Sequence, residues 1–496
     1  MRILPDFLKN GGSLRGGWRQ SLMFPAVTTC IVIVLGVLTG TAIVTVPTVA
    51  WALFGVVMAL ALLQAPAHIR IASAILAAVC SRLVVATGIF SSIINFFHFP
   101  LALGAAMVSA FETSHRSPVR RPLEIGLLGL LGLSVLSWII NGGEVLRPLL
   151  DWLVFCEPFL IVYAIVNMPS DRRGVVVLRG LAMAIFFGQL PLMYFQAFTL
   201  GLSDPVRGFF IDMGAGAHVA GAVCLTGALV CCSRVLAADR MGTRLLWLLG
   251  GAALFFATIL ADAKQVIIPF LPALVLVLIV SMRFRLGRVL AFLPLLTVGI
   301  LGAFSLYRPL QIALDWTLIS RGILGKVEAF AVIAEKLSLS WTRWIVGLGP
   351  GNSISRVALM GLEAFVKRDS PVALLNLGPA AVTRELWAMT TSNWLYSASS
   401  VWTGISSWLG LFGDLGLAGL GLFGWTYGRV WWNVRARHGW GAGAARAVLL
   451  MMALLGLLYS WLEEPGFTLT AALVMGLGFT IDDGKIPDTV DRPMMR

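Results

Sequence analysis

Residues 265–282 read QVIIPFLPALVLVLIVSM, an apolar run without a charged side chain. A helix needs about 20 such residues to cross the hydrocarbon core of a bilayer, whereas a barrel strand needs roughly ten of alternating polarity. The run therefore predicts a transmembrane helix. Similar runs predict fourteen spans, at residues 24–44, 47–66, 71–91, 95–112, 123–140, 149–168, 175–199, 216–236, 245–262, 265–282, 288–306, 399–424, 447–463 and 466–482.

The composition agrees with this pattern and excludes a soluble domain of this size. Of the 496 residues, 58% are hydrophobic and 12% are charged, and the mean hydropathy is +0.89. We therefore predict an all-α polytopic membrane protein with both termini in the cytoplasm. The six cysteines fall inside apolar runs without metal-ligand spacing, so we expect neither a metal nor another cofactor.

The net charge of +13 follows the predicted topology. Basic residues gather in short loops between spans, as with Arg234, Arg240 and Arg244, and the positive-inside rule places such loops in the cytoplasm. Topology explains most of the charge, so we expect membrane lipids as partners and no nucleic acid.

The spans divide the chain into three parts. Residues 1–306 hold eleven predicted spans, residues 307–398 form a long external loop, and residues 399–496 hold three more spans and a cytoplasmic tail. Within the loop, residues 323–339 predict an amphipathic helix that lies on the outer leaflet or caps the bundle. Its apolar positions are Val327, Phe330, Ala331 and Ala334.

Basic side chains on the predicted external face suggest an anionic ligand. A guanidinium donates two parallel hydrogen bonds to a phosphate and stays charged at any working pH. Arg207 and Arg321 are the leading candidates, each followed by glycine, and Lys264 and Arg343 are further phosphate candidates. Lipid head groups and surface ion pairs are the alternative explanation for such residues.

A proton acceptor on the same face would be a carboxylate or a histidine. Asp212 and His218 rank first because they follow Arg207 closely, and Asp262 and Glu385 are the other candidates.

Three glycines, Gly347, Gly349 and Gly351, form a separate cluster in the long loop. Glycine lets the backbone approach a sugar or phosphate closely, but the same run is equally typical of a tight turn.

Acidic residues within predicted spans are costly and ask for a reason. Asp151 and Asp414 lie near span ends, where interfacial water is one explanation. Glu157 lies in mid-span beside Pro158, and Arg82 is a possible partner for it.

The order of these features resembles the O-antigen polymerase and O-antigen ligase superfamily over about residues 200 to 425. The matching groups, in chain order, are Arg207-Gly208-Phe209, Asp262-Ala263-Lys264-Gln265, Arg321, Gly347-Leu348-Gly349, and Asp414-Leu415-Gly416-Leu417-Ala418-Gly419. The resemblance implies a metal-independent, inverting glycosyl transfer between polyprenyl-diphosphate-linked saccharides. It also implies a chain-length regulator or export complex as a possible partner.

One departure from the family pattern separates its two branches. The ligases resemble one another in a histidine near the end of the long loop, where this chain reads Ser397-Ala398-Ser399-Ser400-Val401-Trp402. This favours a polymerase over a ligase and leaves the general base open. A lipid-linked oligosaccharide flippase or another transporter is the alternative from a different class, although it would not need the long loop.

Overall fold

The computed structural model describes residues 62, 64–87, 92–112, 117–168, 172–201, 205–211, 216–238, 240–281, 316–362, 377–392, 404–435 and 440–480. These residues form helices and no strands. The predicted spans 24–44 and 288–306, and nearly all of 47–66, lie outside them. The described apolar helices before the long loop are α3 (Ala67–Ala86), η2 (Ser92–Phe96) with α4 (His98–Phe111), α5 (Arg120–Asn141), α6 (Arg147–Asn167), α7 (Arg172–Leu200), α8 (Gly216–Ala237), α9 (Met241–Leu260) and α10 (Lys264–Ser281).

The described apolar helices after the loop are α19 (Ser407–Arg435), α20 (Trp440–Leu458) and α21 (Pro465–Leu477), with the short η3 (Trp461–Glu463) before α21. Every predicted span within the described residues overlaps an apolar helix, although the predicted span 399–424 is shifted from α19 and the predicted span 447–463 runs past the end of α20. In this part of the chain, nine helices are long and apolar enough to cross a membrane, and α10 and α21 are shorter apolar helices. The protein is therefore a helical, multi-pass membrane protein.

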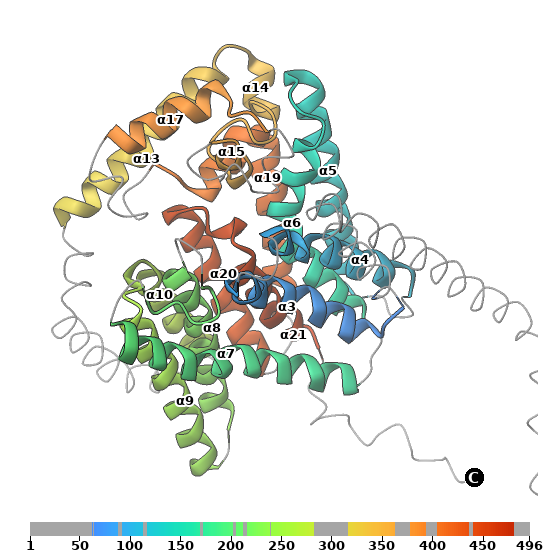
Figure 1. The fold of residues 1–496 in the computed structure, drawn as a ribbon. Helices are drawn as coiled ribbons and strands as arrows, with labels where there is room; N and C mark the ends of the chain where they lie inside the picture. Colours follow the sequence, from blue (N-terminus) through green and yellow to red (C-terminus); the bar gives the residue numbers. More distant parts are fainter. Residues whose placement is uncertain are drawn as a thin grey trace, which may run out of the picture.

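Helices α6, α8, α20 and α21 form the centre of the bundle, where α21 packs against the other three and α8 packs against α20 (Figure 1). Helix α21 is buried along its whole length, and its glycines allow close crossing: a Cβ on Gly476 would lie 2.4 Å from Cδ1 of Ile165. Small residues at a crossing are typical of membrane helices, which gain stability from close packing. By contrast, α9 exposes leucines such as Leu245 and Leu249, as a lipid-facing helix would.

Four helices from the long loop form a second layer at one end of the bundle (Figure 1). We call them the inserted layer: α13 (Trp316–Leu337), α14 (Trp341–Val346), α15 (Arg356–Met360) and α17 (Ala381–Ser392). The layer has its own small apolar core, which includes Ile333, Leu348, Leu386 and Phe412 of α19. It is thus fixed to a spanning helix by side-chain packing.

Helix α13 confirms that an amphipathic helix lies in the loop, but its packed face differs from the apolar positions named above. Ala329, Ile333 and Leu337 are buried, while Val327 and Phe330 are 55% and 43% exposed. The buried face of α13 is formed by residues spaced four apart and includes an alanine, whereas the large side chains of Val327 and Phe330 lie outside it. The apolar positions Val327 and Phe330 therefore do not pack on the bundle, and of the two predicted placements their exposure agrees with contact to the outer leaflet.

Candidate functional site

Helix α19 is broken at Gly416, and the break joins the bundle to the inserted layer. Gly416 has φ 66° and ψ −162°, a conformation open almost only to glycine. The break frees carbonyl groups that a continuous helix would satisfy. Those of Gly413 and Asp414 accept hydrogen bonds from the backbone N–H groups of Leu348 and Gly349, at 2.8 and 3.2 Å. Broken helices survive at membrane depth only with such partners.

The Asp414 side chain completes this connection. Its Oδ2 accepts a hydrogen bond from the N–H of Gly351 at 3.0 Å, and its Oδ1 accepts from Asn352 and Ser353 at 3.0 and 2.8 Å. The aspartate is fully buried. Three N–H donors satisfy a buried carboxylate well, so Asp414 has a structural reason to lie within a span. Interfacial water is not needed to explain it.

Residues 347–353, which we call the docking turn, hold the three predicted glycines. Gly347, Gly349 and Gly351 have φ of 82°, 105° and 65°. A Cβ on Gly347 would lie 2.2 Å from the carbonyl oxygen of Asp414. The tight-turn interpretation therefore accounts for these residues, and contact with a substrate stays a prediction.

Arg147, at the start of α6, holds the other side of the docking turn. Its guanidinium donates to the carbonyl oxygen of Gly351 at 2.8 Å and to Oδ1 of Asn352 at 2.5 Å, and it also bonds Gly378 and Glu144. The residue is only 4% exposed. Spans α6 and α19 thus hold one short segment of the loop between them.

A second connection joins the inserted layer to the turn between α20 and α21. Arg356 of α15 donates from Nη1 to the carbonyl oxygen of Glu463 at 2.8 Å and to Oε2 of Glu464 at 2.5 Å. Its backbone N–H bonds the Glu463 carboxylate. Burial raises the pKa of Glu463 to about 8, with the charge of Asp414 acting in the same direction and the N–H of Arg356 opposing it.

Together these side chains form a buried polar cluster that the sequence did not reveal as a unit. Its members are Arg147, Asp151, Arg356, Asp414, Glu463 and Glu464. The sequence contained one indication of these residues, because acidic side chains within membrane spans are energetically unfavourable and suggest a role. Nothing in their spacing showed that side chains so far apart along the chain would converge.

The predicted Arg207 lies beside the first turn of α8. Gln196 fixes its position, because Oε1 of that side chain accepts hydrogen bonds from the N–H groups of Arg207 and Gly208 at 2.9 and 2.8 Å. A Cβ on Gly216 would lie 3.2 Å from Cδ of Arg207. The half-buried His218 follows on the same turn of α8, so the structure brings these two predicted residues to one helix start.

This helix start and the polar cluster lie at the same end of the bundle. Phe210, next to the Arg207 turn, packs on the start of α21, where a Cβ on Gly466 would lie 2.4 Å from its ring. Gly466 in turn follows Glu464 by two residues. Arg207 and the cluster are therefore linked through the first turn of α21.

Lys264 begins α10 after a tight turn. Its Nζ lies 3.2 Å from Oδ2 of Asp262, and Asp262 has φ 51°, rare for a residue with a Cβ. The turn packs on α8, because a Cβ on Gly221 would lie 2.5 Å from that of Ala263. Lys264 thus neighbours the same helix as Arg207 and His218.

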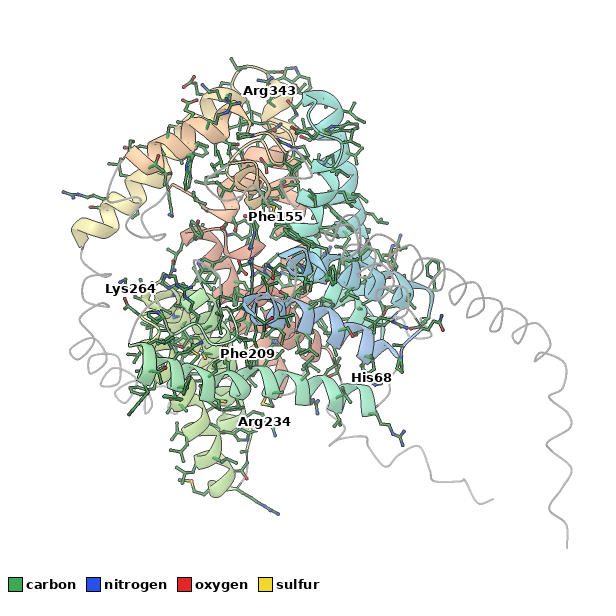
Figure 2. All side chains as sticks on the ribbon, in the orientation of Figure 1. His68, Phe155, Phe209, Arg234, Lys264 and Arg343 are labelled. Carbon is green, nitrogen blue, oxygen red and sulfur yellow. The ribbon has the colours of Figure 1, made fainter. Side chains whose placement is uncertain are left out.

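The other predicted residues are not gathered there. Arg321 is exposed on α13, and Arg343 lies on α14 at the far end of the inserted layer, well apart from Lys264 (Figure 2). Asp212 lies outside the described residues. The structure therefore unites Arg207, His218 and Lys264 around α8 and separates Arg343 from them.

Glu157 has a different partner from the one suggested by the sequence. Its Oε1 lies 2.5 Å from Nδ1 of His98 on α4, and both side chains are buried. Helix α4 runs beside α6, which brings the histidine to the carboxylate. A second buried polar site thus lies inside the bundle.

No known family model matches this sequence, and no curated protein matches it. The likeness to the polymerase and ligase superfamily therefore rests on short motifs and their order. The structure adds where those motifs lie: two flank the start of α8, and two meet at the break in α19.

Proposed function

We propose that this protein is a polysaccharide polymerase that joins polyprenyl-diphosphate-linked oligosaccharide repeats at the outer face of the bacterial inner membrane. The observation that supports this best is the docking turn on the broken helix α19, which ties the inserted layer to the bundle end that carries Arg207 and Lys264. A loop built into the bundle in this way suits chemistry at the bilayer surface.

The diphosphate would bind near the start of α8. Backbone N–H groups and the helix dipole favour anions at a helix N-terminus, and Arg207 lies against that turn. Lys264 begins the adjacent helix α10. Arg321, on the inserted layer, would approach the phosphates or sugars from the other side, whereas Arg343 lies well apart from Lys264 and would not share this site. Gly347, Gly349 and Gly351 would shape this wall.

In the proposed reaction, a hydroxyl of one lipid-linked repeat attacks the anomeric carbon of the growing chain. The new glycosidic C–O bond forms as the bond from that carbon to the diphosphate oxygen breaks, with inversion. The hydroxyl proton passes to a base, for which His218 and Asp212 are the first candidates. Fixed positive charges would stabilise the leaving diphosphate, and neither a metal nor a cofactor is required.

Glycan transfer to another acceptor, as in the ligases, uses the same bond changes and is the closest alternative. Transport is a second candidate, because the His98–Glu157 pair is buried inside the bundle and such pairs are typical of ion and proton pathways. The inserted layer favours the enzyme, since a flippase does not need it.

The test uses purified protein in liposomes with a lipid-linked repeat from the producing cells. Product length is followed for the wild type, Arg207→Lys and Arg321→Lys. Arg384→Lys is the matched control, because Arg384 is an exposed arginine of α17 whose guanidinium donates to the carbonyl oxygen of Pro379. Loss of one fixed donor is expected to slow transfer by about 10²–10³-fold.

A ladder of longer lipid-linked glycans that is lost in Arg207→Lys and Arg321→Lys but kept in the control supports the proposal. Movement of the lipid between leaflets without any growth of the glycan would replace the polymerase with a transporter. Transfer to an added acceptor without a ladder would favour a ligase.

A further inference from the structure

Asp151 of α6 is a buried carboxylate without a donor. Both of its oxygens are buried, and within the described part of the chain no hydrogen-bond donor reaches either of them. The residue has no exposed surface. A buried ionised carboxylate in this state is very costly, so something must compensate its charge.

The nearby cations are engaged elsewhere. Arg147 lies one turn earlier on α6, but its guanidinium bonds Glu144 and the docking turn. Arg356 bonds Glu463 and Glu464. The charge of Arg147 acts on Asp151 from a distance, yet neither guanidinium donates to it.

The neighbours that face Asp151 are acidic. The Asp414 carboxyl is close enough to share a proton with it, and Glu463 of η3 is a further acidic group nearby. The Cys156 thiol, also on α6, is buried nearby. Two adjacent carboxylates in an apolar surrounding do not both ionise, because one shared proton turns their repulsion into a hydrogen bond.

We propose that Asp151 and Asp414 form a buried proton-binding site that holds one proton between them. Asp414 keeps the negative charge, because three backbone N–H groups already donate to it. The proton resides on Asp151, whose O–H donates to Asp414. The site therefore controls the docking turn: release of the proton places a second negative charge beside the carboxylate that holds residues 351–353.

Infrared spectroscopy of the purified protein in lipid tests this site without any substrate. The wild type at pH 7 is expected to show the C=O stretching band of a protonated carboxyl group, which shifts in D₂O. Because Glu463 is also protonated at pH 7, the band has two contributions, and only the contribution of Asp151 is lost in Asp151→Asn. Both contributions are retained in Glu335→Gln, whose glutamate is 70% exposed on α13. A wild type without the band overturns the proposal, as does a band unchanged in Asp151→Asn.

Amide hydrogen exchange at residues 351–353 provides a second readout. Relative to intrinsic exchange, protection in the wild type is expected to fall at alkaline pH as the proton leaves. Protection in Asp151→Asn stays constant, because the asparagine N–H₂ still donates to Asp414. Loss of the infrared band on adding NaCl at pH 7 would contradict the proposal and show that the site binds a sodium ion instead of a proton. Neither measurement depends on glycan transfer, so their failure would leave the proposed function standing.

Discussion

Nζ of Lys326 donates a hydrogen bond to the carbonyl oxygen of Leu458 at 3.2 Å. An amine of the inserted layer thus satisfies a carbonyl in the last turn of the spanning helix α20. A cation is favoured at a helix C-terminus, but burial dominates here and lowers the pKa of Lys326 to about 8.

This burial predicts a pH-dependent stability. The unfolded chain binds a proton on Lys326 up to about pH 10.4, whereas the folded protein releases it near pH 8. The unfolded state therefore binds more protons between these values, and stability rises with pH across this window. Thermal unfolding in detergent compares the wild type with Lys326→Met. Between pH 8 and pH 10, the midpoint temperature of the wild type should rise relative to that of the variant. Parallel curves would contradict the prediction.

For Glu463 we predict the opposite effect in a lower pH range, where stability should fall as the pH rises. Its pKa is raised from the usual range of a glutamate to about 8, so the folded state holds a proton that the unfolded state loses near pH 4.3. Its contribution to stability is complete below that value and is lost as the pH rises through 8. Glu463→Gln should remove this loss. Glu335→Gln, at an exposed carboxylate, should keep the slope of the wild type.

Gly416→Ala should destabilise the junction between α19 and the docking turn. The added Cβ would lie 2.4 Å from the carbonyl oxygen of Ile345, in a backbone conformation that alanine rarely adopts. The strain alone costs about 1–3 kcal/mol. Gly424→Ala on the same helix is the matched control, since nothing lies within 4 Å of its Cβ. We expect a lower unfolding midpoint for the first variant and an equal or higher one for the control.

Two substitutions compare the strengths of the contacts that hold the docking turn. Arg147→Met removes charged donors to Gly351 and Asn352, and each such bond contributes about 1.5–3 kcal/mol. Ser137→Ala removes a neutral hydroxyl that donates to the carbonyl oxygen of Val346 at 2.6 Å and more weakly to that of Asp414 at 3.3 Å. Loss of its main hydrogen bond should cost about 0.5–1.5 kcal/mol. Amide exchange over residues 347–353 should accelerate more in the first variant. The reverse order would show that the guanidinium does not hold the turn.

The spans were predictable because bilayer thickness imposes one length on every apolar helix. The run at 265–282 appears as α10, and 216–236 appears as α8 almost unchanged. The break at Gly416 was harder to predict, because a straight helix and a broken helix can have the same mean hydropathy. The φ of Gly416 reports the break, and the sequence does not show it.

The candidate site was predictable only in its parts. Arg207 and Lys264 were chosen as charges next to spans, and the structure places both beside α8. The pairing of Glu157 with His98 depends on which helices are neighbours. Such contacts between distant residues follow from packing, and hydropathy carries no information about them.

The break in α19 has a consequence for the order in which the protein is made. Ser137, which bonds the carbonyl of Val346, is synthesised first, and the docking turn follows. Asp414 leaves the ribosome last, 63 residues after Gly351, which donates to it. Domains and segments fold from the N-terminus during synthesis. The partners of the broken helix are therefore already outside the ribosome when that helix enters the membrane. Its unpaired carbonyl groups can form hydrogen bonds at once, without exposure to lipid until later residues are translated.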